Sequence, residues 1–204
     1  MTCLATGISS EVRLFADDTV LFRQICSPDD HHRLQHDLHQ LEQWAAKWQM
    51  RFAPTKCFVL PVTLRTNSWH FSYRLCETGL GEVKYYKYLG AYITSSLSLS
   101  LQCEEVKTKA NKILYVLQRN LSSCDRAIKS RAYASLARPI GEYASVTRSP
   151  HTAKDISAIE SIQRRAARFV FYDYSLNISV SAMLADQNWQ SLKERRIIND
   201  LTMF

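Results

Sequence analysis

The stretch EVRLFADDTVLFRQ, residues 11–24, decides the fold of the first half of the chain. Val, Leu and Phe suit a pleated surface and Asp suits a turn, so the stretch predicts two short strands joined at Asp17-Asp18. Adjacent carboxylates repel each other, and a turn keeps both away from the core. The pair therefore suits a divalent cation, and Mg²⁺ prefers oxygen ligands of this kind. A solvated turn is the simpler alternative.

A helix and further strands are expected after the hairpin. Ser27-Pro28-Asp29-Asp30 is typical of a helix start, with Ser as N-cap, Pro at the first helical position and acids in the first turn. The helix is expected to run to about Gln49, because apolar residues recur at helical spacing at Leu34, Leu38, Leu41, Ala45 and Trp48. Residues 56–62 and 83–93 are strand-like, and Gly90 marks a turn or a close backbone approach.

From about Leu101 the pattern is helical. One face carries Val106, Ala110, Ile113, Leu117 and Leu121, while another carries Lys109, Lys112 and Arg119. Thr152 is expected to cap a helix with apolar residues Ile156, Ile159, Ala166 and Val170, and with Arg164, Arg165 and Arg168 near its end. A last helix is expected from about Trp189 to Phe204. The sequence therefore predicts an α+β fold, with a mixed part over residues 1–97 and an all-helical part over residues 98–204.

Charge is unevenly distributed along the chain. Residues 1–100 carry ten Lys/Arg and nine Asp/Glu, whereas residues 101–204 carry sixteen and ten, so a polyanion is expected to be attracted to the second half. The six cysteines form no C-x-x-C pair, which favours free thiols over a zinc site. No apolar run is long enough for a membrane span and no signal peptide is recognised, so we expect an intracellular protein, nuclear or cytoplasmic, without a membrane partner.

The hairpin and four further segments carry a family resemblance. Phe15-Ala16-Asp17-Asp18 resembles the Y/F-x-D-D box of reverse transcriptases, and segments similar to those of LINE-type (non-LTR) retrotransposon enzymes follow in the same order. These segments are LEQWAAKWQMRF (41–52) with PTKC (54–57), KYLG (87–90), RPIGEYAS (138–145) and IESIQRRAARF (159–169). The chain departs from the family at Ala53, where Asn is usual, and at Thr147-Arg148-Ser149-Pro150, where Val-Trp-x-Pro is usual.

The resemblance implies an RNA-directed DNA polymerase with two-metal nucleotidyl transfer. Residues 1–97 would be the C-terminal portion of the palm, and residues 98–204 a helical thumb and the region after it. Asp17 and Asp18 would be Mg²⁺ ligands, and Lys56 would lie near the triphosphate and protonate the pyrophosphate that leaves. The primer end would be positioned by Tyr88, Leu89 and Gly90. The partners would be an RNA template, a DNA primer and deoxynucleoside triphosphates, with phosphates contacted by Lys109, Lys112, Arg119, Arg164, Arg165 and Arg168.

Only fourteen residues precede Phe15, whereas the family has its third metal-binding Asp and its nucleotide pocket upstream of the hairpin. We therefore expect a fragment that does not polymerise DNA alone. The main alternative is a non-catalytic, basic nucleic-acid-binding remnant or domesticated protein, and another is an unstable pseudogene product. His32, His36 and His39 share a helix face but lack the Glu of H-E-x-x-H, which favours surface histidines over a metal site. Patterns typical of hydrolases, NTPases or dinucleotide-binding proteins are absent from the sequence.

Overall fold

The structure is a computed structural model that describes residues 7–65, 70–143, 149–175 and 178–202. The first part of this chain contains one long helix and several small two-stranded sheets, and helices dominate the second part, so the expected combination of helices with short strands is confirmed. The chain divides into two compact units, which are described separately. Unit 1 comprises Met1–Tyr86 and Thr94–Ser96, and unit 2 comprises Lys87–Ile93 and Leu97–Phe204.

The predicted hairpin is present in unit 1. Strand β1 (Glu11–Phe15) pairs antiparallel with β2 (Asp18–Phe22), and Phe15 is the register partner of Asp18. The turn therefore consists of Ala16 and Asp17, and Asp18 already belongs to the second strand. A two-residue hairpin turn matches the twist of its strands when its first central residue has a positive φ. Ala16 is that residue, and its φ is 53°.

The predicted helix is α1 (Pro28–Lys47). Its N-terminus is capped by Asp30, whose carboxylate accepts hydrogen bonds from the backbone N–H groups of Cys26 and Ser27, each at 3.0 Å. The helix ends two residues earlier than expected, in a Schellman motif. Gln49 has φ 55°, and the N–H of Met50 donates to the carbonyl of Ala45 at 2.8 Å, which stops further helical turns.

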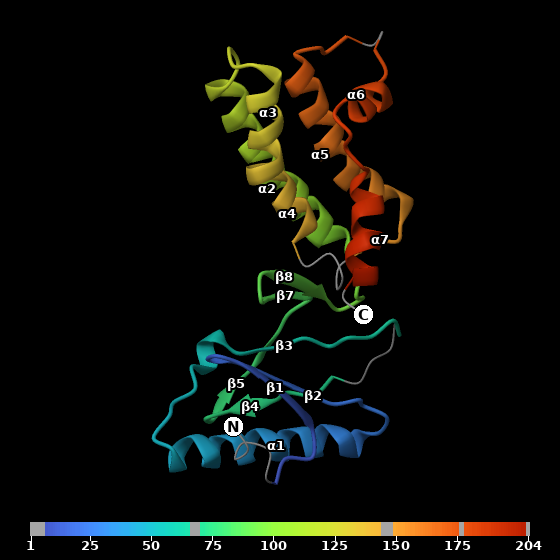
Figure 1. The fold of residues 1–204 in the computed structure, drawn as a ribbon. Helices are drawn as coiled ribbons and strands as arrows, with labels where there is room; N and C mark the ends of the chain where they lie inside the picture. The colour runs from blue at the N-terminus through green and yellow to red at the C-terminus, as the bar shows by residue number, and fades with distance from the viewer. Residues whose placement is uncertain (1–6, 66–69, 144–148, 176–177, 203–204) are drawn as a thin grey trace. The chain divides into compact units, whose positions relative to one another are not determined.

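Short strands complete unit 1, and the strands of the unit lie to one side of α1 (Figure 1). The bounds are η1 (Pro54–Lys56), β3 (Phe58–Val59) parallel to β6 (Gly81–Glu82), and β4 (Arg74–Leu75) antiparallel to β5 (Thr78–Gly79). The side-chain amide of Gln35 on α1 fixes β4, because it accepts from the Arg74 N–H at 2.8 Å and donates to the Arg74 carbonyl at 2.9 Å. The strand expected over residues 56–62 is shorter, since Lys56 ends a 3-10 turn.

A second hairpin, β7 (Tyr85–Tyr88) with β8 (Ala91–Thr94), turns at Leu89 and Gly90. The φ angles of these two residues are 47° and 76°, and positive values at both central positions define a type I′ turn. A Cβ atom on Gly90 would lie 3.7 Å from the Tyr143 ring. Gly90 is therefore a turn residue, as predicted, and also a point where another part of unit 2 approaches the backbone.

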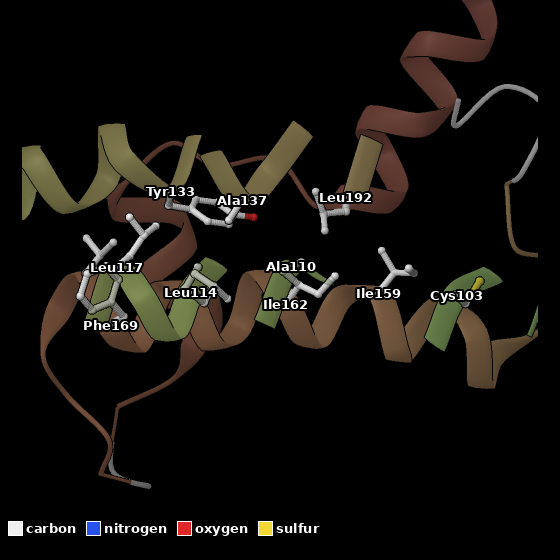
Figure 2. Packing of buried hydrophobic residues seen from close by; sticks show 12 residues of the cluster. Cys103, Ala110, Leu114, Leu117, Tyr133, Ala137, Ile159, Ile162, Phe169 and Leu192 are labelled. Carbon is white, nitrogen blue, oxygen red and sulfur yellow. The ribbon is translucent and has the colours of Figure 1, made fainter. Parts of the chain in front are cut away.

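Helices form the rest of unit 2. They are α2 (Ser100–Asn120), α3 (Arg126–Ala132), the π-helical η2 (Tyr133–Ala137), α4 (Arg138–Glu142), α5 (Ala153–Phe171), α6 (Val180–Asp186) and α7 (Leu192–Thr202). The core lies between α2 and α5, where Ala110 and Leu114 pack against Ile162 with Tyr133 above them (Figure 2). Burial of these apolar side chains stabilises the unit.

Capping side chains set the N-termini of two helices in unit 2. The Thr152 hydroxyl accepts from the Asp155 N–H at 3.2 Å, which confirms the predicted cap of α5. Helix α7 begins at Leu192 and not at Trp189, because Ser191 and Glu194 form a reciprocal capping box with bonds of 3.0 and 3.1 Å. Thr147 and Arg148 of the Thr147-Arg148-Ser149-Pro150 segment and the end of RPIGEYAS lie outside the described residues, as does Phe204.

Candidate functional site

Asp17 and Asp18 lie at the tip of the β1–β2 hairpin and are both exposed. Asp18 shares a sheet face with its cross-strand partner Phe15, and Arg13 lies further along that face. Among the described residues, three or more His, Cys, Asp or Glu side chains never gather in a group that could hold a metal ion. Mg²⁺ is commonly bound through only one or two carboxylates, with water and substrate phosphates as its other ligands. The Asp17-Asp18 pair fits the protein part of such a site.

A buried carboxylate on α1 holds the base of this hairpin. Asp37 is only 1% exposed and accepts hydrogen bonds from the backbone N–H and hydroxyl groups of Ser9 and Ser10, at 2.5 to 3.0 Å. Arg23, directly after β2, donates to both hydroxyls and lies 3.7 Å from the Asp37 carboxylate. We call these four residues the Asp37 clasp. It ties the chain before β1 and the chain after β2 to the same helix.

Opposing effects set the pKa of Asp37. Burial alone would raise it, but the hydrogen bonds from Ser10 and Ser9 favour the charged form, and the pKa lies below its ordinary value. Sequence reasoning did not identify Asp37, although a signal was present. The residue lies three positions after Leu34 and four before Leu41, on the apolar face of the helix, where an acid needs buried donors.

The other residues expected at the catalytic centre are in two places. Lys56 is exposed at the end of η1 in unit 1. Tyr88, Leu89 and Gly90 form the end of β7 and the following turn, within unit 2. Their outward-facing turn is compatible with contact to another molecule, since Leu89 is 37% exposed.

The basic residues expected on α2 differ in their surroundings. The ammonium group of Lys109 is 3.3 Å from the Glu105 carboxylate, so part of its charge is compensated. Lys112 and Arg119 are exposed and have no acidic partner within the described part of the chain. Spacing of seven residues places Lys112 and Arg119 on one side of the helix.

The three arginines of α5 all make hydrogen bonds to neutral groups. Arg164 donates to the Ser157 carbonyl at 3.2 Å and Arg168 to the Ser175 carbonyl at 2.7 Å. Arg165 donates to the Asn111 side chain at 3.3 Å, which links α5 to α2. We call Lys112, Arg119 and Arg165, three exposed cations without an acidic partner among the described residues, the basic face of α2 and α5.

Several other cations in unit 2 are unavailable to an external polyanion. Lys107 pairs with an acid on its own helix, and both Arg138 and Arg195 bind Glu142. Arg196 is 3% exposed, and its burial lowers the pKa of its guanidinium group. The formal charge of the helical half therefore overstates the number of cations that could contact phosphates.

Two of the histidines of α1, His36 and His39, make local contacts. His39 lies 3.2 Å from the Glu42 carboxylate, and His36 lies 3.4 Å from the Gln40 amide. His32 and His36 border an open concavity of about 300 Å³ and do not form a metal-ligand group with other described residues. The described cysteines, Cys26, Cys57, Cys76, Cys103 and Cys124, are free thiols.

Within the described ranges, each helix is too short or too polar to cross a membrane.

Comparison with known proteins assigns no family or function to the sites described above. The chain matches no protein-family model, no curated protein and no solved structure.

Proposed function

We propose that this chain is the C-terminal part of a LINE-type RNA-directed DNA polymerase, with the β1–β2 hairpin in its catalytic centre and unit 2 in contact with template and primer. One observation carries the proposal: two adjacent, exposed carboxylates stand at the tip of a two-residue hairpin. The Asp37 clasp supports it, because a metal-binding turn must be held firmly by its scaffold to keep its ligands in position.

In this proposal Asp17 and Asp18 would hold Mg²⁺, which when bound supplies charge stabilisation for the phosphoryl group that is transferred. The residues of the chain itself have three tasks. Asp17 and Asp18 present solvent-accessible carboxylates, Arg23 and Asp37 fix the hairpin on α1, and the basic face of unit 2 attracts the phosphates of the nucleic acid.

The test is primer extension on an RNA template with Mg²⁺, using the chain joined behind the fingers and front palm of a LINE-type polymerase. Asp17→Asn and Asp18→Asn should each lower extension by orders of magnitude, because each removes a negative ligand from the metal that stabilises the transition state. Asp29→Asn is the matched control, since Asp29 is also an exposed acid in unit 1 but lies on α1. Full activity in both hairpin variants would contradict the proposal.

A second candidate function is non-catalytic nucleic-acid binding. The observation that favours it is the absence of a third acidic ligand beside Asp17 and Asp18 in the described residues, combined with the basic face of α2 and α5. In that case the joined polymerase would show no extension even without substitutions, while the chain would still bind nucleic acid in a salt-dependent manner.

A further inference from the structure

One exposed aromatic ring lies within the basic face of α2 and α5. The side chain of Tyr115 is 66% exposed, although Leu114 directly before it is fully buried in the core. Lys112 lies three positions before Tyr115 and Arg119 four positions after it, and side chains at these spacings are neighbours on a helix surface, with Cβ atoms about 5–6 Å apart. The Tyr115 ring therefore stands between two exposed cations.

The third cation of the basic face reaches the same surface from α5. Asn111 lies one helical turn before Tyr115, and its side-chain oxygen accepts a hydrogen bond from the Arg165 guanidinium at 3.3 Å. The acid nearest to Arg165 along α5 is Glu160, which is five positions earlier and so about 140° away around the helix, where it accepts from the Lys193 N–H. Arg165 is therefore not neutralised from its own helix.

The charges of Lys112 and Arg119 are also available to an external group. The only acids of α2, Glu104 and Glu105, lie about 10 Å or more from Lys112 along the helix axis, and each already pairs with another lysine, at 3.4 and 3.3 Å. Asp125, the next acid after α2, caps α3 by accepting a bond from a backbone N–H at 2.8 Å. Among the described residues, three cations without acidic partners therefore lie around one ring, and their charge selects an anionic partner.

We propose that the Tyr115 ring stacks on an unpaired base of a single-stranded nucleic acid, while Lys112, Arg119 and Arg165 contact the phosphates that flank this base. An aromatic ring can stack on any base, and cations beside it attract the backbone, so the two together provide sequence-independent binding of a single strand. An acidic peptide would satisfy the cations but offers carboxylates without a flat base beside each of them. A duplex keeps its bases stacked inside, so the ring should add affinity for single strands alone. The inference rests on the proposed function, in which unit 2 contacts nucleic acid, and assigns this surface to an unpaired strand.

The test measures binding of the full chain to a mixed-sequence DNA oligonucleotide that contains 2-aminopurine, as a single strand and as a duplex. Tyr115→Leu should bind the single strand about tenfold more weakly and should quench 2-aminopurine fluorescence less, because the stacking ring is lost. Duplex affinity and the slope of log K against log salt should stay unchanged, because no charge is removed. Tyr115→Phe, which keeps the ring, should bind like the original chain.

Tyr174→Leu is the matched control, since Tyr174 is 56% exposed in unit 2 but lies outside the basic face, and its loss should not change single-strand affinity. The melting temperature of Tyr115→Leu should equal that of the original chain, because the side chain is exposed, so that weaker binding is not caused by misfolding. Three results would overturn the inference: unchanged single-strand binding in Tyr115→Leu, an equal loss for single strand and duplex, or displacement of the strand by polyglutamate as readily as by unlabelled strand. These results leave the proposed function standing, whereas an original chain that bound neither form would contradict both the contact of unit 2 with nucleic acid and this inference.

Discussion

The carboxylate of Asp37 determines how the hairpin is attached to α1. A buried charge is costly, but hydrogen bonds to a charged group contribute about 1.5–3 kcal/mol each, and Asp37 accepts four. Arg23 adds a positive charge at 3.7 Å and shares the serine hydroxyls. The donors therefore favour the charged form of Asp37 over the neutral form in spite of the burial, in agreement with its lowered pKa.

The stability of unit 1 should depend on pH in the acidic range. Backbone N–H donation from Cys26 and Ser27 lowers the pKa of Asp30 from 3.8 to about 2, and hydrogen bonds also keep the pKa of Asp37 below its ordinary value. Because both values are depressed in the folded state, the stabilisation is fully present above about pH 4 and is lost as the pH falls toward 2. Urea unfolding monitored by far-UV circular dichroism between pH 5 and about pH 2 measures this loss.

Asp30→Asn serves as the control for this pH dependence. The variant should be less stable than the original protein at pH 5, and its stability should change less as the pH falls, because one of the two depressed carboxyl groups is gone. An original protein whose unfolding free energy stayed constant down to about pH 2 would contradict the role given to both carboxylates.

Among the secondary-structure elements, those with strong periodicity or capping signals were predictable from the sequence. The hairpin at residues 11–22 and the helices α1, α2 and α5 were expected near their observed positions, because apolar spacing and caps agree there. The β4–β5 turn was not expected, since Cys76 and Glu77 adopt φ angles of 47° and 60°, a conformation for which Gly, Asn or Asp would be the usual signal. The short helices α3, α4 and α6 span too few residues to show a period.

At the same scale, the basic face of α2 and α5 predicts a measurable salt dependence. The triple variant Lys112→Gln/Arg119→Gln/Arg165→Gln should weaken nucleic-acid binding and flatten the slope of log K against log salt by up to about three units, if all three residues contact phosphates. The double variant Lys107→Gln/Lys109→Gln is the comparison, because the ammonium groups of both lysines already lie within 3.4 Å of Glu104 or Glu105. Filter binding over a range of salt concentrations gives both slopes.

Equal changes per removed charge in the triple and the double variant would show that the basic face has no special role.

Only some properties of these cations could be predicted from the sequence. Sequence reasoning placed Lys112 on a helix face apart from the apolar residues and Arg165 near the end of its helix, and both are exposed. It could not tell that Lys109 has an acidic neighbour or that Arg196 is buried. Ion pairs and burial depend on side-chain placement, which periodicity does not determine.

At the scale of the whole molecule, each unit has its own set of stabilising contacts. Unit 2 has an apolar core between α2 and α5, centred on the fully buried Leu114 (Figure 2). Unit 1 has less buried apolar surface and depends more on polar links from α1, such as Gln35 to β4 and the Asp37 clasp. Damage to one unit should therefore leave the other largely folded.

Leu114→Ala tests this independence. The substitution should lower the unfolding free energy of unit 2 by about 2–5 kcal/mol, because it removes buried methyl groups and leaves a cavity. Amide protection in α1 should not change when it is measured by hydrogen exchange. Tyr115→Ala is the matched control, since its side chain is 66% exposed on the same helix and its loss should cost no more than about 0.5 kcal/mol. Loss of protection throughout both units in Leu114→Ala would show a single cooperative structure.

The β1–β2 hairpin also affects how the protein behaves in concentrated solution. Within the described residues each of its strands pairs only with the other, so both outer edges present unpaired N–H and C=O groups. Phe15 and Phe22 are 60% and 46% exposed on the same element. Free edges next to apolar side chains promote edge-to-edge aggregation, whereas the charges of Glu11 and Arg13 on β1 oppose it. Solubility should therefore depend on these two charged residues.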